Sequence, residues 1–127
     1  MEITVKEFEQ TELITIQGRI DSVEASRFSE ALEAANYRGI YKLVVDMHEL
    51  EYMSSAGFRA LAEAQRNGQR HKVGAVVLAR VPSRVREALE MVGFAEHFHI
   101  FEDVESALEF TANLPSGDSN ADAAAPA

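Results

Sequence analysis

The chain has 127 residues, of which 46% are hydrophobic and 26% charged, a composition typical of one globular domain with its own core. It contains no cysteine, which excludes disulfide bonds and thiolate chemistry, and its formal net charge of −9 argues against binding to nucleic acid or to an anionic membrane surface. No apolar run is long enough to cross a bilayer and no secretory leader is visible, so we expect a cytoplasmic protein without direct membrane insertion.

The first twenty residues predict two strands. Apolar and polar residues alternate at 3–5 and again at 14–16, which is the pattern of half-buried strands. The step at Thr11-Glu12 suits a tight turn between them, so we expect a β-hairpin there.

Strands and helices alternate in the rest of the chain. Continuous apolar runs predict buried strands at 41–47 and 73–79, and HFHIF predicts a short strand at 97–101. The order ββαβαβαβα indicates an α/β fold with a mixed sheet and right-handed crossovers. Helices are expected at 28–35, 55–68, 82–92 and 104–111, with Gly39 and Gly93 as stops after the first and third of them.

The last thirteen residues differ in composition from the rest. From Pro115 the sequence PSGDSNADAAAPA has no large apolar residue, so burial cannot offset the entropy lost on ordering. We therefore predict one domain at 1–114 and a disordered tail at 115–127.

The sequence predicts no enzyme and no cofactor. It contains no GxxxxGK[ST] phosphate loop, no GxGxxG and no GxSxG, and its acidic residues lie mostly on predicted outer helix faces. His97 and His99 are expected on one side of a strand, but no third ligand stands at a spacing that indicates a zinc site.

The stretch YMSSAGF, at residues 52–58, is the most informative. It places Ser54 and Ser55 where a strand gives way to a helix, and a serine there caps the helix by accepting a backbone N–H bond. The same helix end attracts anions, so either serine is also a candidate phosphorylation site. Local chemistry alone leaves both interpretations open.

Three stretches resemble the STAS domain, and within it the bacterial anti-sigma factor antagonists, from residue 3 to about 112. They are ITIQGRIDSVEASRF, KLVVDMHELEYMSSAGFRALAEA and VGAVVLARVPSRVREALEMVGFAEHFHIFEDVESAL. The resemblance implies a four- to five-stranded mixed sheet with about four helices packed mainly on one side.

The resemblance also implies a function in transcription regulation without catalysis. Such antagonists bind a serine kinase/anti-sigma factor of the ATP-binding, histidine-kinase-like type, and phosphorylation on serine releases them. A serine phosphatase reverses the modification, which completes the partner switch. The alternative within the family is a constitutive STAS subunit of a lipid or anion transporter complex.

The family pattern at the site is Asp-Ser-Ser/Ala/Thr-Gly-hydrophobic. It implies Ser55 as the phosphoacceptor, with Ser54 as a rival because it stands where the aspartate is usual. The implied contact surface combines the 18–22 turn, a loop at 47–54 and the start of the 55–68 helix. The residues expected to contact the partner are Asp21, Ser22, Asp46, Glu51, Met53, Ser54, Gly57, Phe58 and Arg59.

Simpler roles remain open for several of these residues. Asp21 can serve as a turn or cap residue, and Asp46 as a hydrogen-bonded anchor. Gly18 and Gly57 suit backbone geometry, whereas Arg59 stands one turn into the helix, where it can pair with a phosphate.

Overall fold

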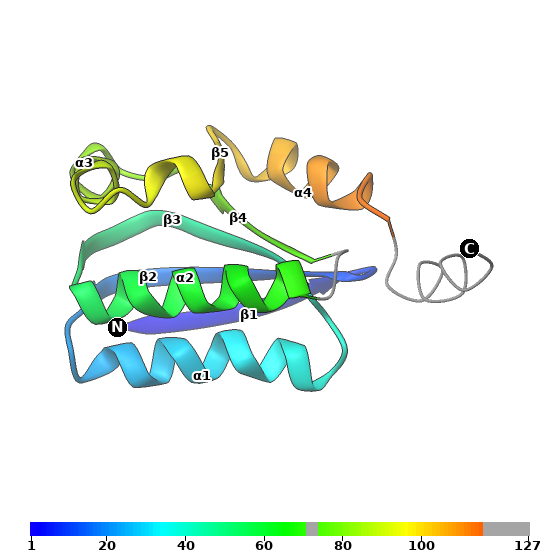
Figure 1. The fold of residues 1–127 in the computed structure, drawn as a ribbon, viewed down its shortest axis with the longest axis horizontal. Coiled ribbons are helices and arrows are strands. Elements are labelled where there is room, and N and C mark those ends of the chain that lie inside the picture. Colours follow the sequence, from blue (N-terminus) through cyan, green and yellow to red (C-terminus); the bar gives the residue numbers. More distant parts are fainter. Residues whose placement is uncertain (71–73, 116–127) are drawn as a thin grey trace.

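The computed structural model describes residues 1–70 and 74–115, and the predicted tail lies almost entirely outside them (Figure 1). One five-stranded sheet has the order β1-β2-β3-β4-β5, with β1 antiparallel to β2 and every other neighbouring pair parallel. The predicted α/β mixed sheet is therefore confirmed. The elements are β1 (Glu2–Phe8), β2 (Thr11–Ile20), α1 (Glu24–Tyr37), β3 (Lys42–Met53), α2 (Ser55–Arg70), β4 (Ala75–Ala79), α3 (Ser83–Met91), the 3₁₀ helix η1 (Ala95–His97), β5 (His99–Phe101) and α4 (Val104–Ala112).

The helices lie mainly on one side of the sheet, as expected. Alternate residues of the strands point to opposite faces, so Val45 and Met47 of β3 join the larger core while Val44 faces the other way. The larger core packs against α1, α2 and α3, and α4 covers a smaller apolar cluster on the opposite face. In Figure 1, α1 and α2 run side by side in the same direction.

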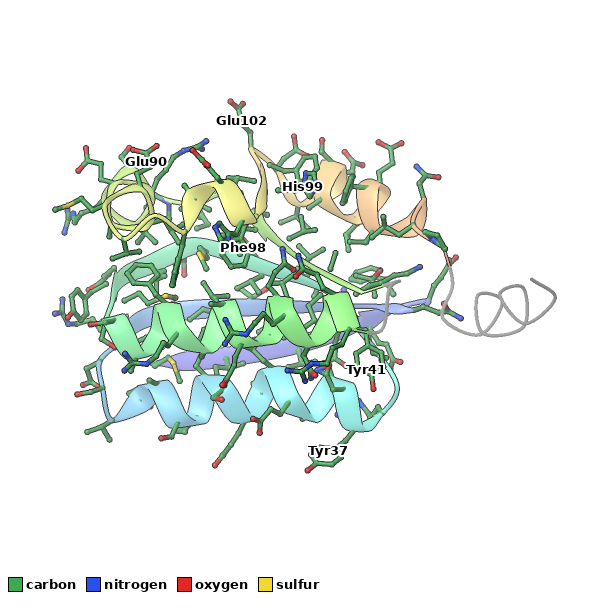
Figure 2. All side chains as sticks on the ribbon, in the orientation of Figure 1. Tyr37, Tyr41, Glu90, Phe98, His99 and Glu102 are labelled. Atoms are coloured by element: carbon green, nitrogen blue, oxygen red, sulfur yellow. The ribbon has the colours of Figure 1, made fainter. Side chains whose placement is uncertain are left out.

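Two neighbouring residues near the end of the sheet show this division directly. Phe98 is buried in the larger core beside α2, whereas the ring of His99 lies 4.6 Å from that of Phe110 on α4 (Figure 2). His97 belongs to η1 and not to β5, so the expected pairing of His97 and His99 on one strand is wrong. Residues 1–70 and 74–115 contain no group of three or more His, Asp or Glu side chains arranged to hold a metal ion.

The first hairpin turn lies two residues earlier than predicted. The turn is formed by Glu9 and Gln10, with Glu9 in the left-handed region at φ 53°, and β2 already begins at Thr11. The Thr11-Glu12 step is therefore the first hydrogen-bonded part of the strand, where Thr11 pairs with Phe8.

β3 is longer than the sequence indicates, and the loop predicted at 47–54 is wrong. The strand continues to Met53 because β2 runs beside it as far as the Ile20–Met53 pair. Two register shifts interrupt this pairing, and the buried residues Met47, Leu50 and Met53 consequently recur every third position. A half-buried strand is predicted by strict alternation of apolar and polar residues, and this spacing does not show it.

Two helix ends agree with the predicted glycine stops, and a side chain caps the start of a further helix. Gly39 and Gly93 follow α1 and α3 with φ of 83° and 78°, a conformation that glycine adopts without steric cost. Asp103 caps α4, since its Oδ1 accepts a hydrogen bond of 2.7 Å from the backbone N–H of Ser106. Among the described residues, none of the helices is both long and apolar enough for a membrane span.

Candidate functional site

The two serines have different positions at the start of α2. Ser54 is half-buried and immediately precedes the helix, and its Oγ accepts a hydrogen bond of 3.4 Å from the backbone N–H of Gly57. Its carbonyl oxygen accepts bonds from Gly57 and Phe58, at 2.9 and 3.1 Å. Ser55 is the first helical residue and is exposed. Ser54 is thus the capping residue, and Ser55 presents its side chain to solvent.

Buried residues around the serines fix where α2 begins. A Cβ atom on Gly57 would lie 2.5 Å from Cγ of Met53 and 3.2 Å from Cγ2 of Ile20, so glycine lets the first turn of α2 approach β2 and β3 closely. Met53 and Phe58 are each only 5% exposed and belong to the larger core. Met53, Gly57 and Phe58 are among the residues predicted to contact the partner. Because they are buried, they fix the position of the first turn of α2 and expose little side-chain surface to a partner.

The turn between β2 and α1 adjoins the start of α2. The backbone N–H of Ser54 donates to the carbonyl of Ile20 at 2.8 Å, which ties the two segments together. Asp21 is exposed, and its Oδ1 accepts a 2.8 Å hydrogen bond from the backbone N–H of Glu24. Asp21 thus has the cap-type role that local chemistry predicts, beside an exposed Ser22.

The exposed side chains among the predicted site residues come from three segments that meet at the start of α2. We call these side chains the α2-start surface and define it as Asp21, Ser22, Glu51, Ser55 and Arg59. Arg59 stands four residues after Ser55, which places both on one face of the helix. Glu51 is exposed near the end of β3. The described residues contribute no ion pair to Arg59, so its guanidinium is available to an added anion.

Asp46 lies apart from this surface. It is 3% exposed and shares its face of the sheet with Val44, on the side of α4 and away from α2. Arg80 binds it through two hydrogen bonds, Nε to Oδ1 at 3.0 Å and the terminal nitrogen to Oδ2 at 2.8 Å. The structure therefore supports the anchor role for Asp46 and separates it from the serines.

Sequence reasoning missed Arg80. It follows β4 directly, in the left-handed region at φ 54°, and its backbone N–H donates to the carbonyl of Phe101 at 2.9 Å. The hydrogen bonds to Asp46 raise the pKa of the Arg80 guanidinium above its ordinary value. An arginine immediately after a buried strand is only a weak indication of an ion pair. The residues around Arg80 in the sequence do not indicate that its partner is Asp46.

The sequence profile of the STAS domain matches residues 2–107. The chain belongs to the STAS domain family. BtrV of Bordetella bronchiseptica, provisionally assigned as an anti-sigma factor antagonist, is 29% identical to this STAS domain over 107 residues, which are 84% of this chain and 91% of BtrV. The anti-sigma-F factor antagonist RsfB of Mycobacterium tuberculosis is 27% identical over 107 residues, which are 84% of this chain and 85% of RsfB.

Solved structures agree on the fold of this STAS domain. The anti-sigma factor antagonist SpoIIAA in its unphosphorylated form superposes with a TM-score of 0.77 at 14% sequence identity. The superposition covers 91% of this chain and 100% of that one. At such low identity the likeness concerns architecture, and the roles of individual residues have to be argued from the site itself.

Proposed function

We propose that this STAS domain is an anti-sigma factor antagonist whose binding is controlled by phosphorylation of Ser55. In its unmodified form it binds a serine kinase/anti-sigma factor through the α2-start surface, and phosphorylation by that kinase releases it. A serine phosphatase returns it to the binding form. The protein acts by binding and performs no catalysis of its own. BtrV and RsfB support the general function because they match this chain along most of their own lengths.

One observation carries the choice of Ser55. Its side chain is exposed at the first position of α2, whereas the hydroxyl of Ser54 is half-buried and accepts the N–H of Gly57. A kinase has to reach the acceptor oxygen with the terminal phosphate of ATP. Ser55 can be reached without opening the cap, and modification of Ser54 would remove a bond that holds the helix start.

The surroundings explain how a phosphate would act without unfolding the domain. A phosphoserine carries about −1.5 to −2 charges at neutral pH. The free N–H groups of α2 and the guanidinium of Arg59 would accommodate that charge. A partner seated against Asp21, Ser22 and Glu51 would instead meet new bulk and new negative charge. Release therefore follows from a local change in the surface.

The test uses the serine kinase/anti-sigma factor that copurifies with this protein from its own cells. We expect ATP to place phosphate on Ser55, read by site-mapped mass spectrometry, and S55A to stay unmodified while still binding. S55D should bind about tenfold or more weakly in calorimetry, which corresponds to about 1.4 kcal/mol. S54A is the matched control and should still be phosphorylated.

Two results would count against the proposal. Phosphate on Ser54 would overturn the residue assignment, and undiminished binding of S55D would overturn the switch. Copurification with a membrane transporter, with neither serine modified in any growth condition, would favour the alternative of a constitutive transporter subunit.

A further inference from the structure

The edge strand β1 is unpaired on its outer side among the described residues. It is the terminal strand of the sheet and, in Figure 1, lies at the side that α1 borders. Of its seven residues only Ile3 is half-buried, and Val5 is 47% exposed although it is apolar. A long edge with free backbone N–H and C=O groups is a template for another strand.

The sequence of this edge is complementary to itself. When two copies of EITVKEF run antiparallel with Thr4 opposite Thr4, Glu2 of each copy faces Lys6 of the other. In the same register Ile3 faces Val5 of the second copy, and Val5 faces Ile3. We propose that β1 pairs in this register with β1 of a second copy, which joins the two sheets into one.

The alternation of side chains supports this register. Glu2, Thr4 and Lys6 share one face of the strand, and Ile3 and Val5 share the other, where Ile3 already packs against the larger core. Pairing would therefore cover the exposed part of Val5 and extend the apolar face across both copies. A slip of one residue either way places Glu2 opposite Glu7 or Val5 and removes both ion pairs.

Within one copy, the Nζ of Lys6 lies over the ring of Phe8, 5.5 Å from its centroid, and neither Lys6 nor Glu2 has an ion-pair partner among the described residues. On β2, Gln17 lies opposite Glu2 and Leu13 lies opposite Lys6, so neither charge faces an opposite charge across the hairpin. A lysine on an edge strand ordinarily discourages pairing. Here it meets a carboxylate in the proposed register, and opposite charges across paired strands are stabilising. The net charge of −9 opposes association, so the dimer forms only at high protein concentration.

Charge exchange tests the pairing by sedimentation equilibrium. We expect the wild-type mass to rise from 14.0 kDa towards twice that value as the protein is concentrated to about 1 mM. E2K alone and K6E alone place like charges opposite one another and should each weaken self-association about tenfold. Mixing E2K with K6E restores both ion pairs, so the mixture should associate at least as tightly as the wild type.

The variants should fold, because Glu2 and Lys6 are exposed. A wild type that stays at 14.0 kDa at the highest concentration overturns the proposal. So does unchanged association of both single variants, or a mixture no tighter than its components.

The register has a separate test because the chain contains no cysteine. T4C places two thiols directly opposite each other, close enough for a disulfide, and should form a covalent dimer under mild oxidation. K6C is the matched control on the same face of β1, and its two thiols would be separated by about four residues of strand. A covalent dimer from K6C but not from T4C would overturn the register. Neither test depends on Ser55, so their outcome is independent of the proposed function.

Discussion

Asp46 and Arg80 form an ion pair whose two side chains differ strongly in their exposure to solvent. The carboxylate of Asp46 is buried, whereas the side chain of Arg80 is 40% exposed. The backbone N–H of His48 adds a third donor to Asp46, at 3.3 Å from its Oδ1. Removing Arg80 would leave a buried carboxylate that water cannot solvate, whereas removing the charge of Asp46 would leave a guanidinium that water still reaches. The two losses should therefore have different costs.

Replacing the arginine should cost more stability than neutralising the aspartate. We expect R80A to lower the free energy of unfolding by about 2 kcal/mol, below the usual range for a buried pair because Arg80 is partly exposed. D46N should cost about 1 kcal/mol, since it leaves no buried charge. Urea denaturation followed by circular dichroism measures both. Arg84, exposed on α3, gives the control R84A, and a cost for R80A no larger than for R84A would contradict the prediction.

Ser54 and Ser55 should also differ in their effect on stability. S54A removes the cap and should cost about 0.5–1 kcal/mol, at the lower end because the bond to Gly57 is long. S55A removes an exposed hydroxyl and should stay within about 0.5 kcal/mol of the wild type. Thermal and urea unfolding of the two variants compare them directly. Equal costs would mean that Ser55 shares the capping role, which would weaken its assignment as a freely accessible acceptor.

At the scale of elements, one side chain joins α2 to the C-terminal part of the sheet. Gln65 is buried, and its Nε2 donates to the carbonyl of His97 in η1 at 2.6 Å. Its Oε1 accepts from the backbone N–H of Val76 in β4 at 2.7 Å. Both ends of the amide are therefore satisfied by backbone groups of other elements.

Replacing this amide by an apolar side chain of similar size should be costly. Q65M leaves the N–H of Val76 and the carbonyl of His97 without partners, and we expect a loss of about 2–3 kcal/mol in urea denaturation. Gln69 lies on the exposed face of the same helix, so Q69M is the matched control and should be nearly neutral. Similar losses in the two variants would show that the bridge contributes nothing beyond helix propensity.

The cap of α4 should make part of the stability depend on acid. The hydrogen bond from Ser106 lowers the pKa of Asp103 from its ordinary value of 3.8. A carboxyl whose pKa is lower when folded stabilises the fold above its unfolded pKa, and that contribution is lost as the pH falls through the folded pKa. D103N keeps a side-chain acceptor that does not titrate, so its stability should fall less than that of the wild type below about pH 4.

Urea midpoints of the wild type and D103N between about pH 6 and pH 2.5 measure this difference. Glu102→Gln removes the same formal charge beside α4 without the cap bond and controls for net charge. Parallel acid profiles of the wild type and D103N would contradict the prediction.

For the whole molecule, local chemistry predicted the element order and the mixed sheet, but not the long-range contacts. Gly39 and Gly93 end helices through their own backbone preferences, so sequence sufficed there. The extension of β3 to Met53 depends on register shifts against β2, which change the spacing of buried residues. The pairing of Asp46 with Arg80 joins residues 34 positions apart and exists only once β3 and β4 are paired.

The charge of the whole chain should make its stability depend on salt. With 21 acidic residues against 12 basic ones, the folded state suffers net self-repulsion. The ion pairs that salt would weaken include Arg27–Glu24 and Arg86–Glu90, which are at least partly exposed and contribute little. Screening of the repulsion should therefore prevail, and salt should stabilise the domain.

We expect the thermal midpoint at low micromolar protein to rise by about 4 °C between roughly 10 mM and 500 mM NaCl, the shift that about 1 kcal/mol produces in a domain of this size. Glu33 and Glu63 line the groove between α1 and α2 and are exposed. Changing both to glutamine removes two of the repelling charges, so the variant should melt higher at low salt and respond less to added salt. A midpoint that falls with salt would instead mean that specific ion pairs outweigh the repulsion, because screening destabilises the fold only where it weakens attractive interactions.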